Sequence, residues 1–356
     1  MVASPAEHPL PPDRGRRFFA AIGFLVRGIK ALPTRLRERA LDSLGSGVST
    51  ALPPFPDVLR LVEAAGGIPD GKLWQDRLLA DCPALRAVRL REVSEDGHGR
   101  VRARLYLPPN GAPKPTAALV WVHGGAFVLG SLDAKEAHWL AMELAVGGIP
   151  VLSVDYRMCI GGVHYPTPLE DVLSAWYWAV ANCDYFGVDA NSLHIGGGSA
   201  GGCLAASAVH RLLDASEQLP ASQILAYPVL EGRLPPPTPE MAAELAVTKL
   251  PSDAWVAEMF ANWSGAADDD HPHVAPAFAD PKGLPPTFVL TCGRDALRRS
   301  SEPYARRLSD AGIAVWHEIL PEAEHAPLDR PGTPDGLRSV DRIRTWLTRG
   351  IAGMAA

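Results

Sequence analysis

The stretch HIGGGSAGG, residues 194–202, places one serine among five glycines. Two kinds of site fit these letters. Residues 196–201 match GxGxxG, in which backbone amides at a helix N-terminus hold the pyrophosphate of a dinucleotide. Residues 197–201 match GxSxG, the nucleophile elbow, in which a tight turn from strand to helix exposes the hydroxyl of Ser199. Both sites need a strand before and a helix after, so the rest of the chain must decide.

Short, nearly continuous apolar runs recur along the chain and indicate strands buried on both faces of a parallel sheet. These runs are 117–123, 149–155, 193–197, 222–229, 286–293 and 314–320. Helical stretches are predicted at 135–146, 168–182, 200–214, 300–311 and 336–350. Before them, the alternating stretches 86–93 and 101–107 predict a hairpin or adjacent antiparallel strands. This succession predicts an α/β fold with a doubly wound, mostly parallel sheet of about eight strands.

A nucleophile elbow requires further parts, and the chain contains them in the required order. It needs an oxyanion loop after an earlier strand, then, beyond the serine, an acid and finally a histidine. Gly124 and Gly125 follow a predicted strand, where two glycines in a tight turn can expose their amides. Asp295 and His325 follow the last two predicted strands. A dinucleotide site expects its glycines in the first βαβ unit, whereas this motif comes after at least four predicted strands. The elbow is therefore favoured.

With these residues in place, the chain resembles the hormone-sensitive-lipase-like esterases of the α/β-hydrolase superfamily. The matching stretches are HGGAF (123–127), VDYR (154–157), YPTPLEDV (165–172), GGSAGG (197–202), GLPPTFVLTCGRDALR (283–298) and LPEAEHA (320–326). The resemblance spans about residues 85–350. It implies an α/β-hydrolase fold with a helical cap, Ser199 as nucleophile, His325 as base and Asp295 as the acid that orients it. It further implies an oxyanion hole formed by the amides of Gly124, Gly125 and Ala200.

Three departures from the family pattern stand near this site. Ala126 takes the place of a third glycine, and Gly198 takes the place of an aspartate before the nucleophile. The stretch MCIGGVHYP, residues 158–166, follows Arg157 where the family has a Leu-Ala-Pro-Glu-like sequence. None of these changes touches the three predicted catalytic residues, but the change at Gly198 removes a carboxylate next to the elbow.

The domain organisation follows from an interruption in the alternation. More than fifty residues without a strand signal separate the strand near 229 from the one near 286. We expect residues 85–230 and 281–356 to form the hydrolase core, 231–280 to form a cap insertion, and 1–84 to be a helical segment that contributes to the cap. Within the insertion, Trp255 and Phe260 lie on one helix face and are candidate substrate-binding residues. The alternative is an ordinary helix packed on the core.

The N-terminal segment has its own pattern. Residues 14–39 carry eight basic side chains and one acidic side chain around a helical apolar stripe. We favour a helix that docks on its own protein; weak contact with an anionic membrane surface is the alternative. A secretory signal is disfavoured because no Ala-x-Ala-like site follows the apolar run.

The composition limits the partners and compartments. The net charge of −6 argues against a nucleic-acid partner. Five scattered cysteines without a C-x-x-C pair indicate a reducing compartment, so we expect a cytoplasmic protein. The stretch DDDHPH, residues 268–273, invites comparison with a metal site, but a solvated loop is favoured. We expect no metal and no cofactor, and the sequence leaves a homodimer open.

Together these features predict a serine hydrolase that cleaves small-molecule carboxylic esters through an acyl-enzyme. Two alternatives stay open at this point. The same triad could cleave lactones, amides or formamides. The chain could also be a ligand-binding protein on this scaffold without catalysis, since a fold does not determine function.

Overall fold

The computed structural model describes residues 53–65, 72–96, 99–245 and 251–355 of the 356-residue chain. The basic stretch 14–39, predicted as an amphipathic helix, lies outside these ranges. Of the N-terminal segment, the structure describes helices α3 (Phe55–Ala65) and α4 (Lys72–Asp81). Within the described ranges, no helix has the length and apolar character needed to cross a membrane.

The described chain is built on one eight-stranded sheet in the order β1-β2-β4-β3-β5-β6-β7-β8. The strands are β1 (Arg89–Glu95), β2 (Val101–Leu107), β3 (Ala118–Val122), β4 (Val151–Val154), β5 (Leu193–Gly198), β6 (Gln223–Ala226), β7 (Thr287–Arg294) and β8 (Val315–Glu324). β2 pairs antiparallel with both β1 and β4, and all the other pairs are parallel. The predicted α/β class, the mostly parallel sheet and the antiparallel β1–β2 pair are therefore confirmed.

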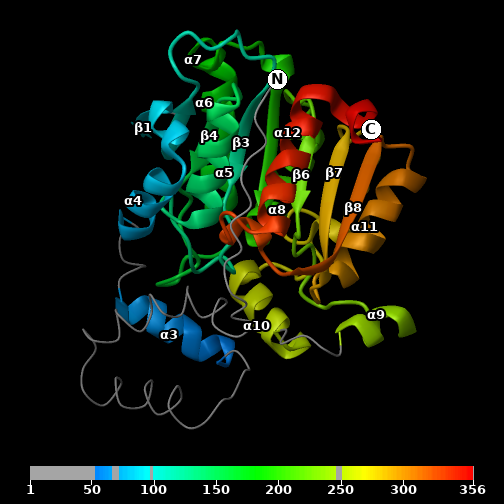
Figure 1. Cartoon of the computed structure of the whole chain (residues 1–356). Coiled ribbons are helices and arrows are strands. Elements are labelled where there is room, and N and C mark those ends of the chain that lie inside the picture. Colours follow the sequence, from blue (N-terminus) through cyan, green and yellow to red (C-terminus); the bar gives the residue numbers. More distant parts are fainter. Residues whose placement is uncertain (1–52, 66–71, 97–98, 246–250, 356) are drawn as a thin grey trace.

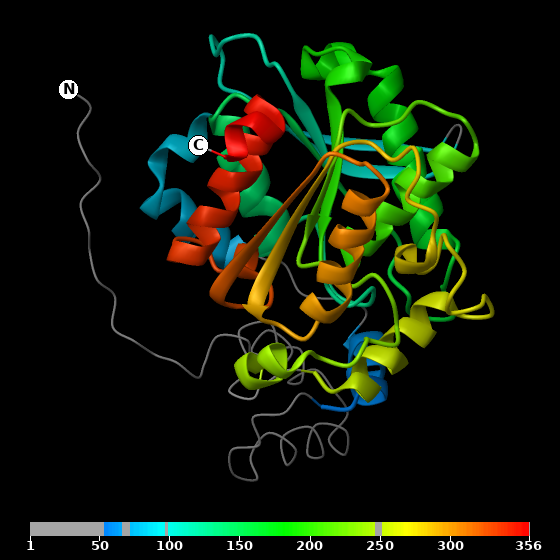
Figure 2. The same ribbon diagram turned by 90° about the vertical axis from the view of Figure 1, so that its right-hand side faces the viewer.

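Helices cover both faces of this sheet. The longer ones of the core are α5 (Lys135–Val146), α6 (Thr167–Ala181), α8 (Ala200–Asp214), α11 (Arg298–Asp310) and α12 (Pro334–Met354). Shorter ones are α7 (Cys183–Phe186), η1 (Pro83–Ala87), η2 (Ala190–Ser192) and η4 (Pro327–Asp329). Buried side chains of α5 and α12 belong to one hydrophobic cluster, and those of α6, α8 and α11 belong to another. Figure 2 shows α12 (red) and α11 (orange) on opposite sides of the strands.

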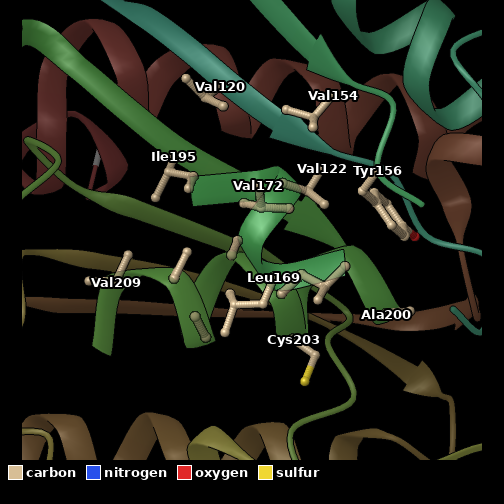
Figure 3. Packing of buried hydrophobic residues seen from close by; sticks show 14 of the residues in the cluster. Val120, Val122, Val154, Tyr156, Leu169, Val172, Ile195, Ala200, Cys203 and Val209 are labelled. Atoms are coloured by element: carbon tan, nitrogen blue, oxygen red, sulfur yellow. The ribbon is translucent and has the colours of Figure 1, made fainter. Parts of the chain in front are cut away.

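The continuous apolar runs of the sequence form the centre of the sheet. All five residues of β3 are buried, and so are all four of β4. Figure 3 shows aliphatic side chains of β3, β4 and β5 facing those of α6 and α8. Because each fully buried side chain of this kind contributes about 1.5–3 kcal/mol, this doubly covered sheet is the main source of stability.

The segment between β6 and β7 has no strand among its described residues. It contains α9 (Pro239–Leu245), α10 (Asp253–Ser264) and the short η3 (Pro276–Phe278). Ser252 caps the start of α10, because its hydroxyl accepts a hydrogen bond from the Trp255 amide at 3.2 Å. Figure 1 shows α3, α9 and α10 gathered below the sheet. The indole N–H of Trp255 donates to the Pro53 carbonyl, which joins α10 to the N-terminal segment.

The turn from β5 into α8 allows no side chain at two of its glycines. A Cβ on Gly197 would lie 2.3 Å from the Gly201 carbonyl carbon, and a Cβ on Gly201 would lie 2.0 Å from the Val122 carbonyl oxygen. The first turn of α8 is therefore pressed directly against the end of β3. Between these glycines, Ser199 has a φ of 53°, and its amide donates to the Ala226 carbonyl at 2.9 Å.

The close approach at Gly201 leads to a stability prediction. Gly201→Ala places a methyl group against backbone, which cannot rotate away, so we expect a loss of about 3 kcal/mol in the free energy of unfolding. Gly147→Ala is the matched control. Gly147 is exposed with a φ of −78°, and the nearest neighbour of a new Cβ is the flexible Arg344 side chain. Its effect should stay within about 0.5 kcal/mol. Urea denaturation measures both, and equal losses would contradict the prediction.

Candidate active site

The three residues predicted to act together lie directly after three parallel strands of the sheet. Ser199 follows β5, Asp295 follows β7 and His325 follows β8. His325 Nε2 lies 2.9 Å from Ser199 Oγ, and His325 Nδ1 lies 2.5 Å from Asp295 Oδ2. The structure thus brings the three side chains, predicted from their order in the sequence, into one hydrogen-bonded chain.

The Asp295 carboxylate uses its two oxygens for two different tasks. Oδ2 bonds to His325, and Oδ1 accepts a hydrogen bond from the Leu297 amide at 3.0 Å. The Asp295 side chain is almost fully buried, whereas 21% of the His325 side chain is exposed. A buried carboxylate bonded on both oxygens is held in one orientation. The geometry therefore accommodates both a catalytic acid and a local cap of the turn that follows.

The electrostatics of the site favour a charged His325. Burial lowers the pKa of His325, but the negative charge of Asp295 and its hydrogen bond act in the opposite sense and outweigh it. The net result is a pKa raised above the ordinary value for histidine. An imidazole in this position can take up a proton from Ser199 and keep it while Asp295 stabilises the resulting imidazolium.

The loop after β3 differs in one respect from the prediction. The Gly124 amide donates to Glu136 Oε1 at 2.8 Å, so it is not free to bind an oxyanion, and the role predicted for it is wrong. Within the described ranges, the amides of Gly125, Ala126 and Ala200 donate to no protein group. Ala200 begins α8, and Ala126 has a positive φ of 56°. Ala126 was not among the predicted oxyanion residues, because an alanine in place of the family's third glycine does not reveal from sequence that its amide is free.

The two candidate substrate-binding residues of α10 have different surroundings. Phe260 has 0% exposed surface, and its ring packs edge-on against Phe127 with centroids 6.3 Å apart. A side chain without accessible surface is part of the core, so its assignment as a substrate contact is not supported. Trp255 is only partly buried, and its ring lies edge-on to Phe55 of α3 with centroids 5.3 Å apart.

The acidic stretch 268–273 shows no ligand arrangement for a metal. His273 Nε2 lies 2.6 Å from Asp214 Oδ2. Among the residues that the structure describes, no three His, Cys, Asp or Glu side chains are grouped so that they could hold a metal ion.

Comparisons with a family model and with known proteins point to the same family. A family model described as the alpha/beta hydrolase fold matches residues 119–328. An ethyl acetate hydrolase of Pseudomonas putida is 32% identical over 237 residues, which are 65% of this chain and 73% of that protein. The carboxylesterase NlhH of Mycobacterium tuberculosis is 32% identical over 251 residues, which are 68% of this chain and 76% of that protein.

Solved structures agree with these relatives. An esterase of Pyrobaculum calidifontis superposes with a TM-score of 0.64 at 30% identity, over 78% of this chain and 92% of that one. A bacterial heroin esterase superposes with a TM-score of 0.69 at 27% identity, over 90% of this chain and 98% of that one.

The Asp295–His325 pair leads to a prediction about pH. Only neutral His325 can accept the serine proton, so kcat/KM should rise with pH through the raised pKa of His325. Asp295→Asn removes the charge that raises this pKa. The midpoint of the remaining profile should therefore move to lower pH, and kcat should fall by roughly 10⁴ because the wrong tautomer is stabilised.

Thermal stability provides the control for this variant. The asparagine Oδ1 can still accept from the Leu297 amide, so the melting temperature should change little. A variant that keeps more than about a tenth of the wild-type kcat would show that Asp295 only caps the turn.

Proposed function

We propose that this chain, which belongs to the α/β-hydrolase fold family and is a carboxylic ester hydrolase, uses Ser199, His325 and Asp295 as its catalytic triad. The observation that carries the proposal is the unbroken hydrogen-bonded chain from Ser199 Oγ through the two nitrogens of His325 to Asp295 Oδ2. Its relatives imply small-molecule esters as substrates. No observation favours the lactone, amide, formamide or ligand-binding alternatives.

The proposed reaction proceeds through an acyl-enzyme. Ser199 Oγ attacks the acyl carbon while His325 Nε2 takes its proton, and the tetrahedral intermediate then expels the alcohol, which receives that proton. Water attacks the acyl-enzyme with the same assistance and releases the acid. We assign the oxyanion hole to the free amides of Gly125, Ala126 and Ala200, the last of which adds the positive end of the α8 dipole.

We further propose that residues 231–280 form a cap over the site, together with part of the segment 1–84, and that 85–230 and 281–356 form the core. The Phe127 ring, one residue beyond Ala126, stacks on Trp263 of α10 with centroids 5.0 Å apart. This contact supports the proposal because it joins α10 to the oxyanion loop.

The first residue of α10, Asp253, forms an ion pair with a residue of α11, the helix that follows Asp295. Arg299 Nη1 lies 2.6 Å from Asp253 Oδ1, and its Nη2 donates to Asp253 Oδ2 at 2.9 Å. Arg299 stands four residues after Asp295 and is itself buried. The bidentate pair therefore fixes the start of α10 relative to the loop that holds the acid.

We place the protein in the cytoplasm, as expected from the sequence. The five cysteines are all unpaired, which suits a reducing compartment. Three of them, Cys159, Cys203 and Cys292, are buried among hydrophobic residues.

Covalent labelling tests the nucleophile. A fluorophosphonate should attach to the wild-type protein at Ser199, because this hydroxyl is paired with a histidine that is itself bonded to a buried carboxylate. Ser199→Ala should lose both labelling and ester hydrolysis while its circular dichroism spectrum stays unchanged. Mass spectrometry of the labelled peptide identifies the site. Label on another residue, or undiminished hydrolysis by the variant, would refute the assignment.

The cap proposal assigns different roles to Trp255 and Phe260 of α10. Trp255→Ala should change the ratio of kcat/KM between short and medium acyl esters, because it opens the contact between α10 and α3. Phe260→Ala should instead lower the free energy of unfolding by about 3–5 kcal/mol and leave this ratio unchanged, because its ring is core. Steady-state kinetics on a series of p-nitrophenyl esters and urea denaturation measure both. An unchanged ratio in Trp255→Ala would contradict the cap proposal.

A further inference from the structure

One buried carboxyl group beside the elbow takes no part in the proposed triad. Glu136, the second residue of α5, is only 4% exposed. Its Oε1 accepts from the Gly124 amide at 2.8 Å, and its Oε2 accepts from the Tyr227 hydroxyl at 3.2 Å. The Tyr227 ring in turn packs edge-on against His325 with centroids 5.3 Å apart. Glu136 thus connects the oxyanion loop to a residue that packs on the proposed base.

The same carboxyl group occupies the space in front of Gly198. A Cβ built on Gly198 would lie 2.4 Å from Glu136 Oε1, 2.6 Å from its carboxyl carbon and 2.8 Å from Oε2. In an aspartate, each carboxylate oxygen lies about 2.4 Å from its own Cβ, as standard bond lengths require. The Glu136 carboxyl group therefore fills space that the side chain of an aspartate at position 198 would need, although it comes from a different element of the fold.

The surroundings of Glu136 determine how it acts. Burial and the charge of Asp329 raise the pKa of Glu136 to about 8, against the opposing effects of the Gly124 amide, Tyr227 and His325. The raised pKa favours the protonated form, in which one oxygen still accepts from Gly124 and the hydroxyl at Oε2 donates to Tyr227 instead of accepting from it. It provides hydrogen bonds without adding a second negative charge beside Asp295.

We propose that Glu136 is a positioning residue for the oxyanion hole, which supplies from α5 the carboxyl group that position 198 lacks. By holding the Gly124 amide, it orients the following peptide units so that the amides of Gly125 and Ala126 face the acyl oxygen. Glu136 does not touch the substrate. This inference rests on the proposed function, because it requires an oxyanion to form next to Ser199.

Substitutions at Glu136 test the role directly. Glu136→Ala releases the loop, so kcat should fall by about 10²-fold, the scale of losing one oxyanion donor, while KM changes little. Glu136→Gln keeps an acceptor for Gly124 and offers an N–H to Tyr227, so it should retain most of the wild-type kcat. The matched control is Glu143→Ala on the same helix. Glu143 Oε1 accepts from the Trp139 indole instead of the loop, so kcat should stay at the wild-type value.

A reciprocal pair tests whether the two positions share one carboxyl group. Gly198→Asp alone forces two carboxyl groups into one space and should lose most activity. Gly198→Asp combined with Glu136→Ala should recover kcat above that of either single variant, a non-additivity expected only of positions in contact. The double variant also tests the positioning role if Glu136→Ala alone does not fold, because a folded and active double variant supports the proposal.

The results of these experiments distinguish a failure of the Glu136 proposal from a failure of the proposed triad. Fluorophosphonate labelling of Ser199 in the wild type reports on the triad alone, and its absence would refute the proposed function. With labelling intact, a folded Glu136→Ala that keeps the wild-type kcat and loses only melting temperature would overturn the positioning role. A double variant no more active than Gly198→Asp would overturn the shared carboxyl site. Slow but complete labelling of Glu136→Ala at Ser199, with reduced kcat, is the result expected.

Discussion

The contact between the first turn of α8 and the end of β3 is the constraint on which the site depends. Only a glycine at position 201 lets the helix backbone approach the Val122 carbonyl, since a Cβ there would lie 2.0 Å from that oxygen. The chain must therefore turn sharply between β5 and α8, and Ser199 takes a φ of 53° at the turn. Strain of this kind persists only where the surroundings hold it, and here the β3, β5 and β6 backbones do so.

Because β3 ends beside the elbow, its own loop begins there as well. Gly124 lies so close that a Cβ on it would be 3.2 Å from Ser199 Cβ. The serine and the free amides of the loop are thus set next to each other by backbone packing, before any side chain is considered. Helix α10 reaches the same loop through the stack of Phe127 on Trp263. Packing in α10 and the geometry of the proposed oxyanion donors are consequently linked.

Two acidic side chains, Asp295 and Glu136, lie near His325, and they differ in their contacts and in their charge. Asp295 is bonded to His325 and raises its pKa, so that the imidazolium formed during attack has a partner. Glu136 is nearly inaccessible to solvent, and burial together with the charge of Asp329 raises its pKa, which favours its neutral, hydrogen-bonding form. Placing a second full charge in this buried region would carry a desolvation cost that the available partners would have to offset.

The sequence by itself determined the sheet, the elbow and the order of the proposed triad residues. Strands buried on both faces appear as continuous apolar runs, and parallel strands end at one edge of a sheet, so residues after β5, β7 and β8 had to meet. Tertiary structure alone decided which other side chains contact the residues of the site. Nothing in the local pattern links Glu136 to Gly124 or to Gly198, because that contact arises from how α5 packs beside the elbow. Likewise, Trp255 and Phe260 have the same helical periodicity, and only their neighbours make one of them core. Periodicity specifies which face of an element is apolar, whereas the identity of its partner depends on packing between segments distant in the chain.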